Sequence, residues 1–169
     1  MFASTQVPAR HSYTIRFHML MGPSNEDTPG RIMAVDYGRR RIGIASSDPM
    51  RMVSKPRCVV AAGDPPDQPT RELLDLVADL EPAIIVVGLP LNMNGTEGEM
   101  ALEARRFAHR LGAAAGVPVV ERDERLSSVE AERTIQELGL PKKKRQDRGL
   151  RDMIAAAILL EDYMRETQG

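Results

Sequence analysis

The sequence has little of what marks a disulfide-stabilised, zinc-binding or membrane protein. Its 169 residues include a single cysteine, Cys58, so neither a disulfide framework nor a cysteine-rich zinc site is expected. No apolar run reaches the length of a membrane span. The aromatic residues, three Phe, three Tyr and no Trp, are too few and scattered to form a platform for base stacking. We therefore expect a protein of the cytoplasm.

The chain reads as one folded domain behind an extension. Residues 1–30 mix polar residues and prolines with a short apolar patch and lack the pattern of a signal peptide, so we interpret them as a flexible N-terminal extension. Residues 31–169 then form the domain, which is long enough to bury a core without disulfides. The net charge of −1 argues against a general nucleic-acid coat protein, although basic residues gather locally.

The apolar pattern predicts strands first and then helices alternating with strands. Strands are expected over 32–37, 42–47, 52–61, 83–87 and 117–120, and helices over 70–80, 96–115, 127–139 and 150–164. Thr96 with Glu99 has the spacing of a capping box at a helix start. The unbroken apolar run at 83–87 is typical of a parallel strand buried on both faces. This order predicts an α/β fold: a mixed five-stranded sheet, three antiparallel strands followed by parallel ones, flanked by helices.

Three acidic residues fall where this fold would bring them together. Asp36 ends the first strand, Glu124 follows the strand at 117–120, and Asp152 lies at the start of the last helix. Sites in such sheets gather at the carboxyl ends of the parallel strands, so we expect one cleft to hold these carboxylates. Asp123 is an alternative to Glu124, because adjacent residues of an extended segment point to opposite sides.

Oxygen ligands without His or Cys suit Mg²⁺ or Mn²⁺. A carboxylate triad that holds two such ions supports in-line displacement at a phosphodiester. The predicted chemistry is therefore metal-dependent hydrolysis of a nucleic-acid backbone. Each acid also has an ordinary explanation, since Asp152 alone is typical of a helix N-terminal charge and Glu124 of a solvated turn.

Basic and polar residues near these acids are candidates for binding nucleic acid. They are Arg39, Arg40, Arg41, Asn92, Asn94, Thr96, Arg125, Lys142, Lys143, Lys144, Arg145 and Arg148. Cationic side chains would hold the phosphate backbone, and the loop from Asn92 to Thr96 leads to a helix N-terminus, which favours a phosphate. Solvated basic turns and an ordinary capped loop explain the same residues equally well.

Four segments resemble the YqgF/RuvX family, whose members are described as pre-16S rRNA nucleases and as Holliday junction resolvases with a ribonuclease H-like fold. They are 34–38 with 41–45, then 85–97, 123–131 and 152–156, and the resemblance extends over nearly the whole domain. It implies that Asp36, Glu124 and Asp152 correspond to the family's metal-binding acids. It also implies a hydrolase that processes the 16S rRNA precursor in ribosome biogenesis. The arginine-rich turn at 39–41 departs from the family pattern.

Three other functions remain open at this stage. A resolvase of branched DNA would use the same chemistry and would need a homodimer, because two strands must be cut symmetrically. A non-catalytic RNA-binding assembly factor would keep the fold and use only the basic residues. An ATP-binding phosphotransferase is suggested by Asp36-x-Gly38, but a single domain lacks the second lobe that would close on the nucleotide.

Overall fold

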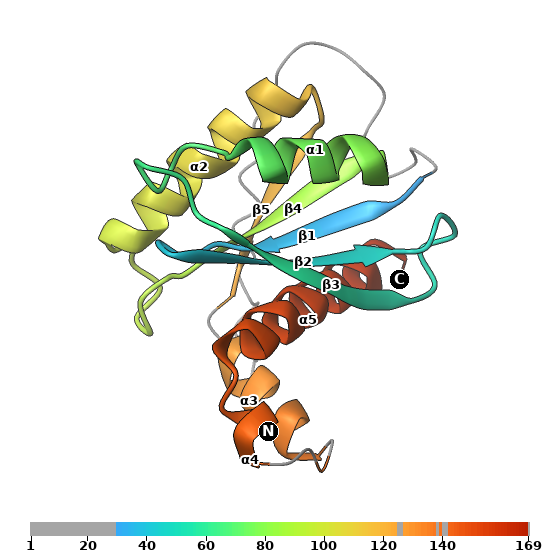
Figure 1. Cartoon of the computed structure of the whole chain (residues 1–169), viewed down its shortest axis with the longest axis vertical. Coiled ribbons are helices and arrows are strands. Elements are labelled where there is room, and N and C mark those ends of the chain that lie inside the picture. The colour runs from blue at the N-terminus through green and yellow to red at the C-terminus, as the bar shows by residue number, and fades with distance from the viewer. Residues whose placement is uncertain (1–29, 125–126, 138, 140–141, 169) are drawn as a thin grey trace, which may run out of the picture.

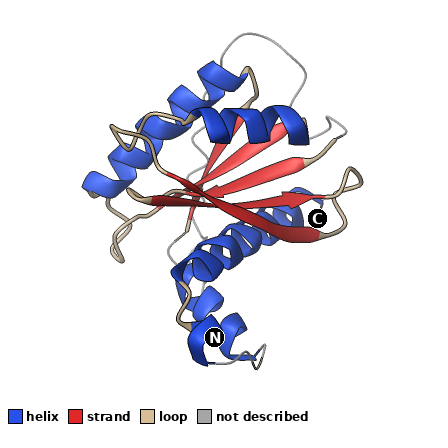
Figure 2. Cartoon of the chain, in the orientation of Figure 1, coloured by secondary structure: helices blue, strands red, loops and turns tan. Residues whose placement is uncertain are grey.

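The computed structural model describes residues 30–124, 127–137, 139 and 142–168, and it contains one mixed sheet with helices on both faces (Figures 1 and 2). The strands are β1 Ile32–Asp36, β2 Arg41–Ser47, β3 Ser54–Ala61, β4 Ile84–Leu89 and β5 Val119–Asp123. The helices are α1 Arg71–Leu80, α2 Glu99–Ala115, α3 Ser127–Glu137, α4 Lys142–Arg145 and α5 Arg148–Gln168. The predicted 1–30 extension lies outside the described residues, apart from Gly30.

The five strands stand in the order β3-β2-β1-β4-β5. β2 pairs antiparallel with both β1 and β3. On the other side of β1, β4 pairs parallel with β1, and β5 pairs parallel with β4. This arrangement confirms the predicted mixed five-stranded sheet. β1 and β4 occupy the middle of the sheet, which agrees with their almost fully buried apolar residues.

Strand alternation divides the core into two layers. Met33 and Val35 face α1 and α2, whereas Ile32 and Ala34 face α5, as expected for side chains that alternate along a strand. Figure 1 shows α1 and α2 on one side of the sheet and α5 on the other, with α3 and α4 beyond the first turns of α5. In β1, the even-numbered residues therefore face α5, and the odd-numbered residues face α1 and α2.

Two helix starts differ from the sequence prediction. Thr96 does not cap α2, because Gly98 holds the N-cap position and the Thr96 hydroxyl donates to Asn94 Oδ1 at 2.6 Å within the preceding turn. α5 begins at Arg148, two residues before the expected start, and Asp147 Oδ1 accepts a hydrogen bond from the backbone N–H of Gly149. The two residues added to the predicted helix are Arg148 and Gly149, which apolar periodicity alone could not reveal.

Other boundaries lie within a few residues of their predicted positions. Thr70 caps α1 by accepting from the Leu73 N–H at 3.3 Å, and Pro82 follows the end of that helix. The short helix α4 was not predicted. None of the helices in the described part of the chain is both long and apolar enough to cross a membrane.

Candidate active site

Asp36 stands on the α5 face of the sheet between two positions that lack side chains. It pairs with Gly43 of β2, and Gly88 of β4 is the next position after the Val35–Val87 pair. Strand alternation places all three positions on the same face. The two glycines therefore leave room around the Asp36 carboxyl group for groups that arrive from other elements.

Glu124 occupies the room that Gly88 leaves. A Cβ atom on Gly88 would lie only 2.1 Å from Glu124 Oε2, so any larger residue there would displace this carboxyl group. The Glu124 backbone N–H donates to the Leu89 carbonyl at 3.2 Å, which continues the pairing of β5 with β4. Glu124 is 9% exposed and lies on the same side as Val120, whereas Asp123 is exposed. The structure thus brings Glu124, rather than Asp123, to Asp36.

The Asp36 and Glu124 carboxyl groups hydrogen-bond to each other. The pKa of Asp36 is raised to about 7: burial is the main cause, the hydrogen bond with Glu124 opposes it, and the charge of Asp152 adds to it. Burial also raises the pKa of Glu124 well above its usual range, with the negative charge of Asp36 as the next cause. Two buried carboxylates in contact require a shared proton or a cation to offset their repulsion.

Asp152 approaches from α5. A Cβ atom on Gly43 would lie 2.1 Å from the Asp152 carbonyl oxygen, so the glycine allows the start of α5 to rest directly on β2. The Asp152 carboxylate accepts a hydrogen bond from Arg41 Nε at 2.9 Å. Because α5 begins at Arg148, Asp152 lies in the second helical turn and not the first, and the Arg41 guanidinium balances its charge more directly than the helix N-terminus does.

The three predicted acids are therefore neighbours in two different states: Asp36 and Glu124 contact each other, and Asp152 is ion-paired. Within the described ranges, no three His, Cys, Asp or Glu side chains form a ready-made metal-ligand group. The Asp36 and Glu124 carboxyl groups face each other. Their chemistry nevertheless fits a hard divalent cation, which prefers carboxylate oxygens.

Sequence reasoning missed a second acidic centre on the opposite face of the sheet. Glu103 of α2 is 9% exposed, and its Oε1 accepts a hydrogen bond from the Tyr37 hydroxyl at 2.6 Å. Arg39 Nε donates to both oxygens of Glu103, at 3.2 and 3.0 Å. Burial and the bond to Glu103 raise the pKa of Tyr37 above its usual value. A glutamate four residues before the buried Phe107, in the apolar stripe of α2, was the available signal.

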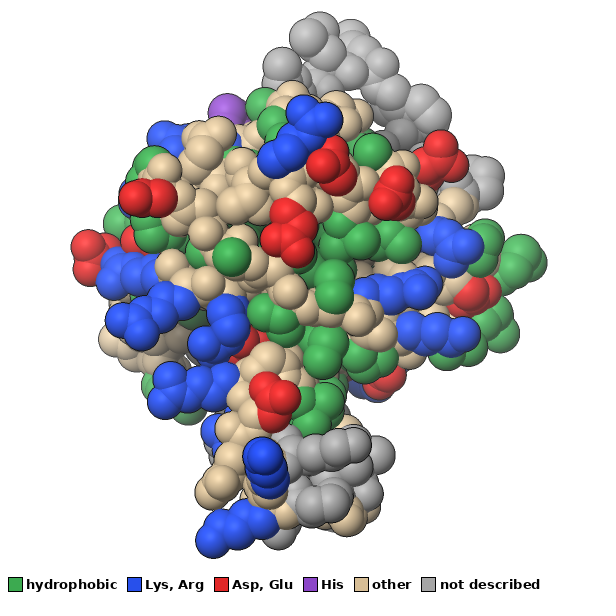
Figure 3. All heavy atoms as spheres, viewed as in Figure 1, with side chains coloured by type: hydrophobic (Ala, Val, Ile, Leu, Met, Phe, Trp, Pro, Cys, Tyr) green, Lys and Arg blue, Asp and Glu red, His purple; other side chains and the backbone are tan. Residues whose placement is uncertain are grey.

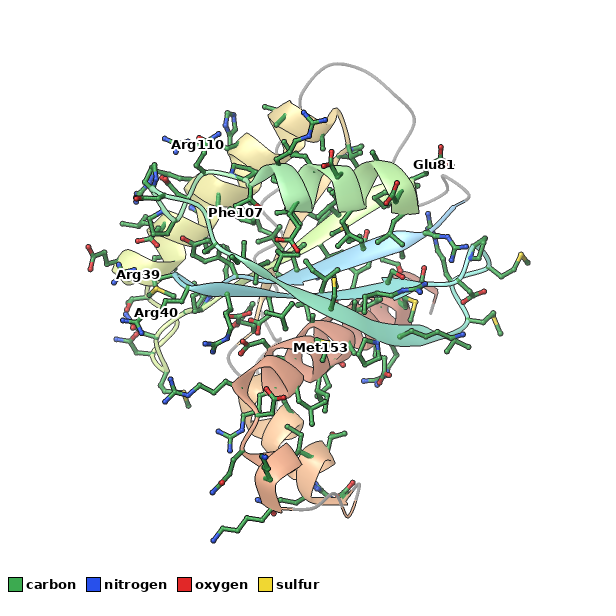
Figure 4. The ribbon with its side chains drawn as sticks, viewed as in Figure 1. Arg39, Arg40, Glu81, Phe107, Arg110 and Met153 are labelled. Atoms are coloured by element: carbon green, nitrogen blue, oxygen red, sulfur yellow. The ribbon has the colours of Figure 1, made fainter. Side chains whose placement is uncertain are left out.

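This contact fixes the arginine-rich turn between β1 and β2. Tyr37 follows Asp36 directly, so one strand end reaches both centres, and Arg39 is drawn toward α2 (Figure 4). Arg40 is exposed, and no ion pair with it is found in the described part of the chain. The predicted basic run thus divides into a structural residue, an exposed cation and, in Arg41, a partner of Asp152.

A cavity of about 340 Å³ opens beside the acids. It is lined by Asp36, Tyr37, Gly38, Arg39, Arg40, Arg41, Arg148 and Asp152. Guanidinium groups are suited to phosphate oxygens, so this cavity joins anion-binding residues to the acidic centre. Figure 3 shows Lys and Arg side chains on the side where Figure 4 labels Arg39 and Arg40, and again toward α4.

The remaining nucleic-acid candidates have different surroundings. Lys142 and Lys143 are exposed on α4. Arg125 and the side chains of Lys144 and Arg145 lie outside what the structure describes. Asn92, Asn94 and Thr96 are exposed but bond to one another, with Asn92 Nδ2 donating to Thr96 Oγ1 at 2.9 Å and Thr96 N–H donating to Asn94 Oδ1 at 3.1 Å. Their binding role remains a prediction.

The five-stranded mixed sheet in the order β3-β2-β1-β4-β5, with helices on both faces, is a RuvC-like, ribonuclease H-like fold. The structure of Thermus thermophilus RuvC in complex with a Holliday junction substrate superposes with a TM-score of 0.50 at 18% identity, covering 81% of this chain and 96% of that one. At that identity, the likeness concerns the fold.

Residues 30–166 match the family model described as "RuvX: Holliday junction resolvase", and the chain belongs to this family. Similar proteins named "Putative pre-16S rRNA nuclease" include one from Roseiflexus sp., 40% identical over 80% of this chain and 94% of its own length. Another, from Syntrophomonas wolfei, is 44% identical over 79% and 93%. A third, from Protochlamydia amoebophila, is 36% identical over 83% and 96%. The family expected from the sequence is thereby confirmed.

Proposed function

We propose that this protein is a metal-dependent endonuclease that hydrolyses phosphodiester bonds in structured RNA, with the 16S rRNA precursor as its substrate in the cytoplasm. The observation that carries the proposal is the contact between the buried carboxyl groups of Asp36 and Glu124, beside a cavity lined by arginines. The choice of substrate is supported by the names of relatives that match this chain over nearly their whole length.

The residues present fit one or two Mg²⁺ or Mn²⁺ ions. Asp36 and Glu124 would hold the metal, with Asp152 as the third ligand, and none of them is the soft ligand that Zn²⁺ or Cu²⁺ would favour. Bound ions of this kind supply an activated water and stabilise the leaving oxygen. A cation would also stabilise the charged forms of both acids, whose pKa values are raised by burial first and by neighbouring negative charges second.

The chain's own side chains account for substrate binding and orientation. Arg40 and Arg148 line the cavity and are exposed, so they would hold the phosphates that flank the scissile bond. Lys142 and Lys143 would extend this contact along the backbone of the nucleic acid. Glu103 acts at a distance, because it holds Arg39 and thereby the turn that carries Arg40.

Cleavage of matched substrates tests the proposal. The wild type is incubated with Mg²⁺ or Mn²⁺ and a precursor rRNA end, a single-stranded RNA or a four-way DNA junction, beside Asp36→Asn and the surface control Asp75→Asn. We expect metal-dependent cleavage of the precursor end, retained by Asp75→Asn and lost by Asp36→Asn with binding intact. Intact binding without cleavage by the wild type would refute the nuclease and favour an assembly factor.

A second candidate function is resolution of branched DNA. It is favoured by the description of the matching family model and by the fold shared with a resolvase. Symmetric incision requires two active sites, so this function predicts a homodimer that cuts the junction in paired positions. Preference for the four-way junction in the same assay, together with a dimer in solution, would select it over RNA processing.

A further inference from the structure

Arg41 stands between the acidic centre and the cavity. Its Nε donates to Asp152 Oδ2 at 2.9 Å, and its side chain also lines the cavity that holds Asp36 and Arg148. The Asp152 side chain is 24% exposed, so it is more accessible than the Glu124 carboxyl group. One cation of the chain thus pairs with a predicted ligand that is more exposed than Glu124.

The fold itself sets this ion pair. Arg41 is the first residue of β2 and pairs with Ala61 of β3, and Gly43 two positions later allows Asp152 to rest on the strand. The partners are 111 residues apart in sequence, so no helical spacing brings them together. Since both backbones belong to the sheet or to the helix packed on it, the two side chains meet without ordering a loop.

Arg41 differs from the other arginines of the cavity. Arg39 is held by Glu103, and its guanidinium also lies 3.4 Å from Glu99. Arg40 and Arg148 have no ion pair within the described ranges. Of these four arginines, only Arg41 forms an ion pair with a predicted metal ligand in the described part of the chain.

We propose that Arg41 is a latch on Asp152: it occupies this carboxylate until a divalent cation binds, and its released guanidinium then holds a substrate phosphate in the cavity. This inference rests on the proposed function. A guanidinium and a divalent cation compete for the same oxygens, and the doubly charged ion is the stronger partner. Arg41 therefore couples metal binding to phosphate binding.

Coupling of this kind is reciprocal. If metal binding frees Arg41 for a phosphate, then a bound phosphate must raise the affinity for metal by the same factor. The arginine is suited to both partners, because its planar donors match a carboxylate and a phosphate equally well. The latch predicts cooperative loading of metal and nucleic acid.

The first test is Mn²⁺ affinity measured by calorimetry without substrate. We expect Arg41→Gln to bind Mn²⁺ about two- to fivefold more tightly than wild type, the range for release of a partly exposed ion pair. Arg148→Gln removes the same charge from the same cavity without releasing Asp152. Any increase in Mn²⁺ affinity common to both variants therefore reflects the loss of a nearby positive charge. The excess in Arg41→Gln should vanish in an Asp152→Asn background.

The second test is the coupling. RNA affinity is measured with the single-stranded RNA in Ca²⁺ and in EDTA, and the gain from Ca²⁺ should be smaller for Arg41→Gln than for wild type and Arg148→Gln. Mn²⁺ affinity that is unchanged or weaker in Arg41→Gln, or an excess that persists with Asp152→Asn, would overturn the latch. These readouts need no cleavage, so loss of the proposed nuclease function and loss of the latch are separate results.

Discussion

Replacing Asp36 with Asn removes one of two carboxyl groups that the fold buries against each other, and we expect the metal-free protein to become more stable at neutral pH. The variant keeps the shape of the side chain and loses its charge. A residue proposed to hold the metal would thus destabilise the metal-free protein, as is common where function opposes stability.

The size of the effect follows from the pKa. Burial raises the pKa of Asp36 from 3.8 to about 7. Between these values the folded protein keeps a proton that the unfolded chain releases, so stability falls as pH rises and the loss is complete above pH 7. A difference of about three pH units corresponds to about 4 kcal/mol, of which about a third is already lost at pH 5.

Urea unfolding in EDTA at pH 5, 6, 7 and 8 measures the gap between the variant and wild type. The gap in the free energy of unfolding should grow over this range by about two-thirds of that amount, with the denaturant slope unchanged. The control Asp75→Asn alters an exposed carboxylate paired with Arg71 on α1, and it should stay within about 0.5 kcal/mol of wild type at every pH.

Metal provides the reverse experiment. Under the proposed function, Mg²⁺ binds the folded wild type and not its unfolded chain, so adding it should raise wild-type stability and narrow the gap to Asp36→Asn. A gap that is independent of pH, or a variant that is less stable than wild type at pH 8, would refute the argument that Asp36 is held as an unfavourable buried charge.

Three further changes test other parts of the site. Gly88→Ala places a Cβ atom 2.1 Å from Glu124 Oε2. Metal-dependent cleavage should therefore fall at least about tenfold, and the free energy of unfolding should change by about 1–3 kcal/mol. Unchanged cleavage would contradict the role of Glu124. Glu103→Gln should destabilise the fold by about 1–3 kcal/mol in urea, because two donors lose a charged acceptor, and equal stability would show that the contact is dispensable. Replacing Lys142 and Lys143 with Ala should weaken RNA binding and make the slope of log affinity against log salt concentration shallower by up to about two. Unchanged affinity would show that both side chains are exposed to solvent without contacting the RNA.

Local patterns in the sequence were sufficient for most of the sheet and for the family. The apolar run from Ile84 to Val87 predicts a strand buried on both faces because only the centre of a parallel sheet offers that environment, and β4 lies there. The helix between Thr70 and Pro82 is bounded by residues that cap and terminate helices for local reasons. Asp36 stood out as a charge at the end of an apolar strand.

Contacts between distant segments decided the rest. Alternation alone could not choose between Asp123 and Glu124, because the choice depends on the register of β5 against β4. The sequence by itself determined which acids were available and in which order the elements run. The tertiary structure decided that Arg41 pairs with Asp152 and that Gly88 leaves room for a carboxyl group, since both depend on how separate elements pack.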